Sequence, residues 1–436
     1  MSVPIDRLYE FLQQSAEMVH GERVIIYRFY PHGSKNICDL NPLLPTDKWF
    51  ERTIYVNVWC NDQEPLDFEY YSLNLRNRSQ SLFYSILQTV GSVHPVKNLN
   101  YNKSVYEKGL LLHSEKNSIN LIKYQTSTDL IPVYYWSHAL IAQDWFRYAK
   151  YFCFKKNNVD KMFLIYNRSW SGTREYRLKF ADFLINHDLL NECKIFCNFI
   201  DQTTNSHYSN HTFSNPQWKP INHLENFLLS RDILSSASAD FNGHDYTSTE
   251  IEVVLETLFD DSRLHLTEKS LRPMACGQPF LLVATAGSLA YLRNYGFKTF
   301  HEIWDESYDT VKDPYQRLQN VIEVMKQISN WDSETKRKNL AHAQEIAKFN
   351  QEWFCSTEFS KVIVEELINN LRLAFTELKS LDNYQRYLTS WNANSNLPAV
   401  RDFLLHNQDY NFPCQETSDQ VIEICKNNVK TLTTQT

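Results

Sequence analysis

The stretch RLHLTEKSLRPMACGQPFLLV, residues 263–283, carries the clearest fold signal of the chain. A helical pattern starts at the run T-E-K, Pro273 bends or ends it, and Gly277 is a typical helix stop. The apolar run over 279–284 then predicts a buried strand. A helix that leads into an apolar strand is typical of an αβ layered domain.

The run Thr267, Glu268, Lys269 at the start of this helix is not needed for packing. A carboxylate in the first turn stabilises a helix by ~0.3–1 kcal/mol, so Glu268 alone has a simple structural explanation. A lysine beside it opposes the helix dipole. A phosphate at the helix start would explain the pair, because Lys269 and backbone N–H groups would hold the anion while Glu268 accepts hydrogen bonds from ribose hydroxyls.

The first third of the chain alternates short strands with helical segments. Runs rich in β-branched and aromatic residues predict strands, and a helix follows the last of them over 138–152. Alternation of this kind favours a mostly parallel sheet with covering helices. The predicted strands span 23–30, 53–60, 109–114 and 131–136.

A second αβ unit begins near Lys156. The run over 161–167 predicts a buried strand followed by a helix, and 248–259 predicts a further helix from its i, i+3, i+4 apolar spacing and a capping box. The stretch 200–245 is rich in Asn, Ser and His and is expected to be irregular. From about Pro314 the pattern is helical. We therefore predict an α/β fold of three parts: an N-terminal Rossmann-like domain, a second Rossmann-like domain, and a C-terminal helical region that packs on both. Their expected bounds are 1–155, 156–330 and 331–436.

Composition places the chain among globular proteins. Of its 436 residues, 43% are hydrophobic and 22% are charged, and the formal net charge of −7 gives no support to a nucleic-acid coat protein. We expect no membrane span, because no apolar run reaches the roughly 18 residues that one needs. Nine scattered cysteines without a CxxC pair, together with an N-terminus that does not read as a signal peptide, predict reduced thiols and a cytoplasmic location.

The common nucleotide and metal motifs are missing from the sequence. It contains no GxxxxGK[ST], GxGxxG, HExxH or GxSxG. Asp260 and Asp261 are adjacent acids rather than a DxD run. We therefore predict no bound metal and no tightly bound cofactor.

The donor-side stretch LTEKSLRPMACGQPFLLV resembles the donor-binding motif of GT-B glycosyltransferases, in particular the inverting α1,3-fucosyltransferases. This match covers about twenty residues. A broader similarity, over most of 53–330, is to glycosyltransferase-like proteins of tailed phages; it includes CNDQEPL, LLHSEKNS, YNRSWSGTREYR and WDESYD. The resemblance implies a GT-B fold, with two Rossmann-like domains facing a cleft, and an inverting, metal-independent transfer of a hexose or pentose from a UDP- or GDP-linked donor.

The resemblance also implies roles for single residues. Glu268 would bind the donor ribose and Lys269 the pyrophosphate, with Thr267 opening the helix. In that family, an arginine just after the first strand of the donor domain often contacts the same phosphates. The segment NRSWSGTREYR contains three arginines, Arg168, Arg174 and Arg177, and the first two are the best placed. Arg263 and His265 lie just upstream of the motif and are further candidates, although each has an ordinary packing role as the alternative.

An inverting transfer needs a general base near the acceptor hydroxyl. In GT-B folds the base comes from the N-terminal domain, and two loops there follow predicted strands. CNDQEP supplies Asp62 and Glu64, and HSEKN supplies His113 and Glu115. His138 ranks below them, and a solvated loop acid is the alternative for each.

The acceptor stays open between two classes. For a phage-encoded enzyme, working in the cytoplasm of its host, a hydroxymethylated base in DNA is the leading acceptor, and a cell-surface or lipid-linked glycan is the alternative. A non-catalytic protein with a GT-B-like fold and a two-domain nucleotide-sugar epimerase are the rival functions. The partners expected are thus a nucleotide sugar and either modified DNA or a glycan.

Overall fold

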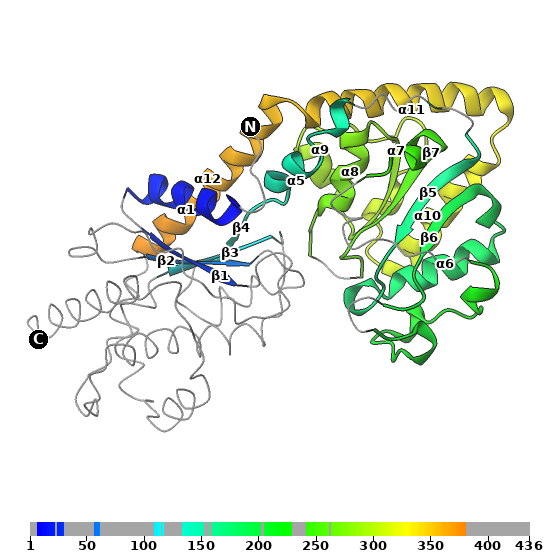
Figure 1. The fold of residues 1–436 in the computed structure, drawn as a ribbon, viewed down its shortest axis with the longest axis horizontal. Helices are drawn as coiled ribbons and strands as arrows, with labels where there is room; N and C mark the ends of the chain where they lie inside the picture. The colour runs from blue at the N-terminus through cyan, green and yellow to red at the C-terminus, as the bar shows by residue number, and fades with distance from the viewer. Residues whose placement is uncertain are drawn as a thin grey trace, which may run out of the picture. The chain divides into compact units, whose positions relative to one another are not determined.

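The computed structural model describes most of the second half of the chain and selected parts of the first (Figure 1). By their contacts the residues form two compact units. Unit 1 comprises Ser137–Glu365 together with Met1–Ile5 and Glu115–Asn117, and unit 2 comprises the rest. The described residues are 7–21, 24–29, 56–61, 109–114, 116, 133–151, 156, 159–201, 205–228, 241–260 and 263–380.

Unit 2 is built on a four-stranded parallel sheet in the order β1-β2-β3-β4. All four strands predicted from the first third of the chain are confirmed within a few residues. Their bounds are Val24–Phe29 for β1, Val56–Asn61 for β2, Gly109–His113 for β3 and Val133–Tyr135 for β4.

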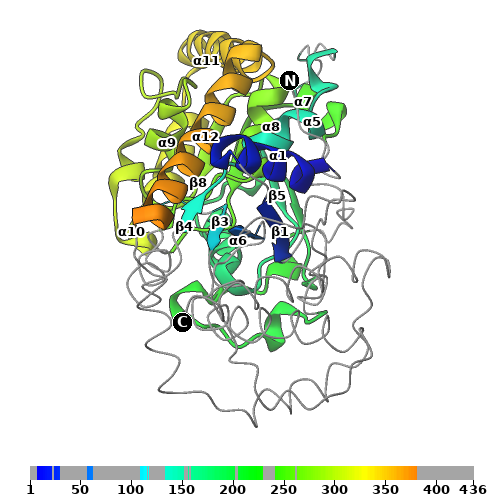
Figure 2. The same ribbon diagram turned by 90° about the vertical axis from the view of Figure 1, so that its left-hand side faces the viewer.

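Two helices of unit 2 pack against each other. Helix α1, Leu8–His20, lies beside the end of α12, Thr357–Ser380, and the ring of His20 stacks on Phe375 with centroids 4.7 Å apart (Figure 1, Figure 2). The hydroxyl of Tyr135 in β4 donates to Glu366 over 2.7 Å, so α12 is also tied to the edge strand of the sheet.

Unit 1 contains a second parallel sheet, in the order β6-β5-β7-β8. The chain forms β5 (Lys161–Asn167), moves outward to β6 (Cys193–Cys197), then returns to the other side of β5 to form β7 (Thr249–Leu255) and β8 (Phe280–Val283). This reversal makes a topological switch point between β5 and β7. In open α/β sheets ligands bind outside the carboxyl ends of the strands at such a point.

The helix predicted over 248–259 is wrong, because these residues form β7. Every residue of β7 except Glu250 is buried, since the strand is central in its sheet and has neighbours on both sides. A strand buried on both faces loses its alternation, and the remaining apolar spacing imitated a helix. The expected capping box is absent as well, because Glu252 pairs with Arg272 at 2.6 Å inside the fold. Strand β6 was not predicted.

The helix that follows the T-E-K run is confirmed as α8, Glu268–Cys276. Thr267 is its N-cap, and Gly277 ends it with φ 63°, in the left-handed region that glycine favours. The helix runs on through Pro273 for three more residues. Its last carbonyls are capped from α11 (Ser333–Phe354), because Gln351 donates to Ala275 and Gln344 to Gly277 over 2.9 and 2.8 Å.

The remaining helices cover the sheet of unit 1 and extend toward the C-terminus (Figure 1). The helical pattern predicted from Pro314 is confirmed as far as Ser380. The two compact units meet along the chain between β4 and α5 and again within α12, and the three-part division with bounds at 155 and 330 stays a prediction. The other helices are α5 Ala139–Trp145, α6 Tyr176–Asn186, α7 Gly243–Thr247, α9 Ser288–Asn294 and α10 Pro314–Ser329.

Within the Asn-, Ser- and His-rich stretch, the described residues 205–228 contain only short 3-10 turns and irregular segments, as predicted, whereas helix α7 begins at Gly243. Two buried carboxylates hold 205–228 against α6. Glu175 accepts from the backbone and hydroxyl of Ser214 and from His211, over 2.7–3.1 Å. About two turns further along α6, the carboxylate of Asp182 accepts from the backbone N–H groups of Ile221 and Asn222. Burial raises the pKa of Glu175, but these hydrogen bonds favour its charged form and bring the net pKa below the ordinary value.

Candidate functional site

The residues that follow β5 and β7 lie at the switch point of the unit 1 sheet. Arg168 comes directly after β5, and Glu256 comes directly after β7. Because both strands are parallel and adjacent, these two positions meet at one edge of the sheet. The start of α8 is attached to the same edge through Glu256, as described below.

The loop after β5 is held by Asp201, which is fully buried. Its carboxylate accepts from the hydroxyl of Ser169 at 2.6 Å and from the backbone N–H groups of Trp170 and Ser171 at 3.1 and 3.2 Å. Trp170 in this loop is fully buried, and its indole N–H donates to the carbonyl of Asn198, so it belongs to the core.

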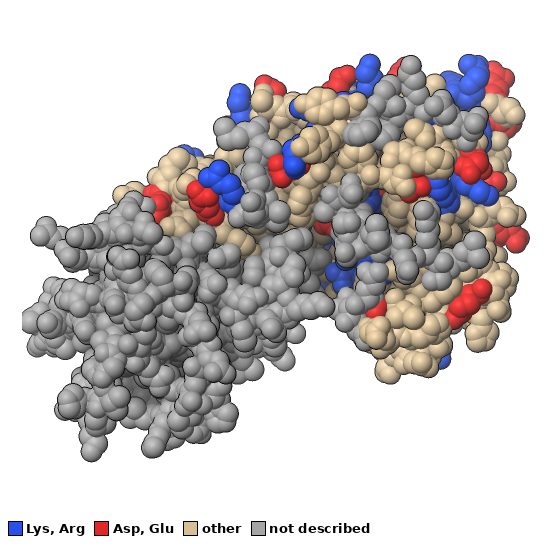
Figure 3. Space-filling model, in the orientation of Figure 1, with Lys and Arg blue, Asp and Glu red and all other residues tan. Residues whose placement is uncertain are grey.

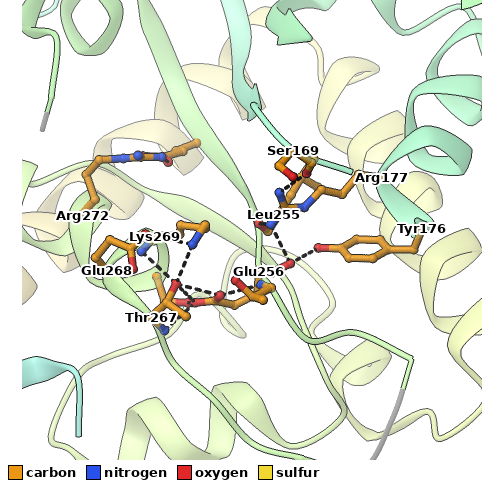
Figure 4. Close-up of polar contacts among 12 residues, drawn as sticks. Ser169, Tyr176, Arg177, Leu255, Glu256, Thr267, Glu268, Lys269 and Arg272 are labelled. Carbon is orange, nitrogen blue, oxygen red and sulfur yellow. Dashed lines mark hydrogen bonds and ion pairs between the residues drawn. The ribbon is translucent and has the colours of Figure 1, made fainter. Parts of the chain in front are cut away.

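Arg177 clamps the switch point and is not a ligand residue. It is 3% exposed, and its guanidinium donates to the carbonyl oxygens of Ser169, Leu255 and Glu256 at 2.6, 2.7 and 2.9 Å (Figure 4). Tyr176 adds a hydrogen bond from its hydroxyl to the carbonyl of Glu256, over 2.6 Å. Helix α6 therefore fixes the backbone at the ends of both β5 and β7.

The side chain of Glu256 organises the other face of this edge. It is fully buried, and its carboxylate accepts from the N–H and the hydroxyl of Thr267 over 2.8–2.9 Å, from the hydroxyl of Ser270 at 2.7 Å and from the N–H of Thr257 at 2.7 Å (Figure 4). These contacts attach the first turn of α8 to the carboxyl end of β7.

Thr267, Glu268 and Lys269, which are consecutive in the chain, contact one another at the start of α8. The hydroxyl of Thr267 accepts from the backbone N–H of Lys269 at 3.2 Å, and the ammonium group of Lys269 lies 2.8 Å from Glu268 and 3.3 Å from Thr267 (Figure 4). The Lys269 side chain is 21% exposed, against 6% for Glu268. An ammonium has three N–H donors, so Lys269 keeps one beyond the two acceptors that it meets in the described part of the chain.

Arg168 and Arg174 join this group. Burial lowers the pKa of Arg168, the nearby carboxylates of Glu268 and Asp201 raise it, and the guanidinium of Arg174 lowers it. Arg168 therefore lies within electrostatic reach of both the α8 acid and the second arginine. Two half-buried guanidinium groups and one lysine then gather around the switch point and the start of α8.

The other donor-side candidates are buried beside this group. Arg263 is 8% exposed and His265 2% exposed. The imidazole of His265 meets that of His138 edge to face, with ring centroids 4.9 Å apart. Both histidines are therefore packing residues of unit 1, and His138 stands at the start of α5.

The candidates for the general base cannot be placed in the same way. Asp62, Glu64 and Glu115 lie outside the described residues, and His113 ends strand β3 of unit 2. Lys116, one residue after Glu115, does belong to unit 1. Its backbone forms a two-hydrogen-bond bridge with Leu264, over 2.6 and 2.8 Å, and its ammonium group lies 4.6 Å from the ring centre of Tyr291.

Some buried polar atoms at this edge have no hydrogen-bond partner among the described residues. They are Oδ1 of Asn167, which ends β5, and the hydroxyls of Thr257 and Thr285, each two residues beyond the end of β7 or β8. Buried polar groups in native proteins are nearly always paired with protein, water or ligand. These three strand ends therefore retain hydrogen-bonding capacity.

The start of α9 provides a contrast at the same edge. The carboxylate of Asp309 accepts from the backbone N–H of Leu289 at 3.1 Å, so the chain itself supplies the anion there. Burial raises the pKa of Asp309, and its hydrogen bonds to α9 only partly offset this. At α8 a lysine occupies the corresponding first turn.

Sequence reasoning missed the two groups that hold this edge together. Glu256 could have been found as a carboxylate directly after an apolar run, had that run been predicted as a strand. Arg317 of α10 donates to the carbonyls of Phe259 and Ala284, after β7 and β8, and gave no local signal in the sequence.

Comparisons with known proteins do not assign the chain to a family. The chain matches no protein-family model, no curated protein and no solved structure. Within the described residues, no group of three or more His, Cys, Asp or Glu side chains is arranged to hold a metal ion. None of the described helices combines the length and apolar character needed to cross a bilayer.

Proposed function

We propose that this chain is a glycosyltransferase whose nucleotide-sugar donor binds at the carboxyl edge of the unit 1 sheet. The observation that carries the proposal is the start of α8 at the switch point, with Glu268 and Lys269 in its first turn and Arg168 in electrostatic reach. A helix start and three cations suit a pyrophosphate, and a carboxylate beside them suits ribose hydroxyls.

The unpartnered atoms at the strand ends support a polar ligand at this place. The amide oxygen of Asn167 accepts hydrogen bonds, and the hydroxyls of Thr257 and Thr285 both donate and accept. Sugar hydroxyls and phosphate oxygens match these groups. In the proposed reaction Lys269 and the arginines stabilise the negative charge that develops on the leaving nucleoside diphosphate, which requires no metal.

We further propose the GT-B arrangement, an inverting transfer, and an acceptor bound by unit 2. The general base would be one of Asp62, Glu64, His113 and Glu115, within hydrogen-bond reach of the acceptor hydroxyl. A hydroxymethylated DNA base is the first acceptor to test. On the face seen in Figure 3, basic and acidic side chains of the described part are interspersed, so the described part of this face offers no broad basic strip for a duplex.

Calorimetric titration with UDP, GDP, CDP, dTDP and their common sugars tests the donor site. We expect one nucleotide to bind, and we expect Glu268→Gln and Lys269→Met each to weaken its affinity about tenfold or more, since each removes a charge-assisted hydrogen bond. Lys326→Met on the outer face of α10 removes the same charge from an exposed pair and serves as the control. Wild-type protein that is folded and binds none of these nucleotides would overturn the proposal.

Transfer is tested with the donor that binds. Labelled sugar is offered with duplex DNA containing hydroxymethylated cytosine, with unmodified DNA, and with glycan acceptors. Incorporation into one class identifies the acceptor. Donor binding without transfer or donor hydrolysis in any mixture would favour the rival function, a non-catalytic nucleotide-sugar-binding protein.

A further inference from the structure

The carboxylate of Glu256 is unusual because it is fully buried and its hydrogen-bond donors among the described residues are all neutral groups. Four different groups donate to it, from Thr257, Thr267 and Ser270. A buried charge is normally paired with an opposite charge. Here the compensating influence comes from these hydrogen bonds, from the positive end of the α8 dipole and from the Arg177 guanidinium, which interacts electrostatically with the carboxylate without a direct hydrogen bond to it.

We propose that Glu256 is a positioning residue for Lys269, acting through the hydroxyl of Thr267; this inference rests on the proposed function. The Thr267 hydroxyl has one proton. Because an ionised carboxylate only accepts, that proton points to Glu256. The lone pairs of the same oxygen then face Lys269, whose backbone N–H lies at 3.2 Å and whose ammonium group lies at 3.3 Å.

This chain of hydrogen bonds fixes the direction in which Lys269 is held. Glu256 sets the Thr267 hydroxyl, Thr267 accepts from the ammonium group, and Glu268 accepts from the same group at 2.8 Å (Figure 4). Two of the three ammonium donors are thereby directed toward the protein. The third is left in a defined direction for a phosphate oxygen, so less ordering is needed when the ligand binds.

The backbone of Glu256 makes the same position rigid from the other side. Its carbonyl accepts from Tyr176 and Arg177 of α6, over 2.6 and 2.9 Å. Helix α6, the end of β7 and the start of α8 therefore converge on this one residue. A purely structural N-cap would need only the Thr267 hydroxyl, and does not need a buried carboxylate behind it.

The test is a double-mutant cycle between Glu256→Gln and Lys269→Met. Gln keeps the shape of Glu but its amide donates as well as accepts, so the Thr267 hydroxyl can reverse its direction. We expect Glu256→Gln to weaken the bound nucleoside diphosphate about three- to tenfold. In the Lys269→Met background the same change should alter affinity by less than about twofold. Affinity for the parent nucleoside, which lacks phosphate, should stay unchanged in every variant.

A second pair of variants covers the case in which Glu256→Gln does not fold. Thr267→Val removes the hydroxyl while keeping the side-chain shape, and Thr267→Ser keeps the hydroxyl. We expect the valine variant to reproduce the loss of nucleoside diphosphate affinity and the serine variant to retain wild-type affinity. Thermal unfolding of each variant shows which of them are folded.

The outcomes separate this inference from the proposed function. If Lys269→Met weakens binding while Glu256→Gln and Thr267→Val do not, or if the cycle is additive, Glu256 is structural only and the inference fails while the donor site stands. A loss of nucleoside and nucleoside diphosphate affinity in equal proportion has the same meaning. If no nucleotide binds the wild type, the proposed function fails and this inference with it.

Discussion

Two lysines stand near opposite ends of the unit 1 sheet, and their surroundings differ. Lys156 lies by the amino ends of β7 and β8, where its ammonium group donates to the carbonyls of Tyr246 and Thr249 and to the side chain of Gln278. Lys269 lies at the carboxyl end, where it meets only Glu268 and Thr267 in the described part of the chain. The first ammonium uses all its donors on the protein, and the second does not.

We use this difference to distinguish a structural cation from the binding cation that we propose. Both side chains are partly buried and both are held by oxygen atoms, so burial alone does not distinguish them. The two lysines differ in how many ammonium N–H donors the described protein groups already use. Helix α8 shows the same difference between two of its own cations, about one turn apart. Arg272 pairs with Glu252 and Tyr246 deep in the fold, whereas Lys269 lies in the first turn of the helix.

The largest expected effect is at Arg272. Arg272→Met leaves the buried carboxylate of Glu252 without its ion-pair partner, which should lower the free energy of unfolding by about 3–5 kcal/mol. Urea denaturation measures the loss. The double variant with Glu252→Gln should recover part of it, since the uncompensated charge is then removed. A loss below about 1 kcal/mol would mean that this network does not anchor α8.

The two lysines should respond to the same substitution in opposite ways. Lys156→Met removes the ammonium group that donates to three oxygen atoms and should lower the free energy of unfolding by about 2–4 kcal/mol, with nucleotide affinity unchanged in protein that remains folded. Lys269→Met should change stability by less than about 1 kcal/mol while weakening nucleotide binding. Equal stability losses at both sites would remove the distinction between them.

The smallest expected effect is the pH dependence at Lys156. Burial lowers the pKa of Lys156 to about 8 from its ordinary value of 10.5. Between these two values the unfolded chain keeps the proton that the folded chain has lost, so the free energy of unfolding should rise with pH. We expect a rise of up to about 3 kcal/mol across this window, relative to Lys156→Met. Parallel pH curves for the two proteins would contradict the shift.

The sequence predicted the elements whose ends carry local signals. The N-cap at Thr267, the glycine stop at Gly277 and the apolar strand after it were all found where expected. The strand β7 was not, because Ile251, Val254 and Leu255 have helical spacing. Its position between β5 and β8, which buries both faces, is a property of the whole sheet and leaves no periodic pattern in the chain.

The candidate site could be predicted only where its residues lie beside such local signals. Glu268, Lys269 and Arg168 lie next to recognisable strand or helix ends, so sequence reasoning could group them. Arg177 had the same local signal but turns inward to three carbonyls. The role of Glu256 depends on contacts with residues 11 and 14 positions away, and only the folded arrangement shows them.

The bridge between Lys116 and Leu264 has a consequence for dividing the protein into fragments. Unit 1 is not one continuous piece of chain, because Glu115–Asn117 belongs to it while the residues on both sides belong to unit 2. A fragment of residues 137–365 would lose the strand partner of Leu264, three residues before Thr267. Its backbone N–H and carbonyl would lose these two hydrogen bonds, close to the start of α8. Limited proteolysis or expression of isolated halves is therefore expected to yield an incomplete site, whereas cleavage that leaves 115–117 associated should preserve it.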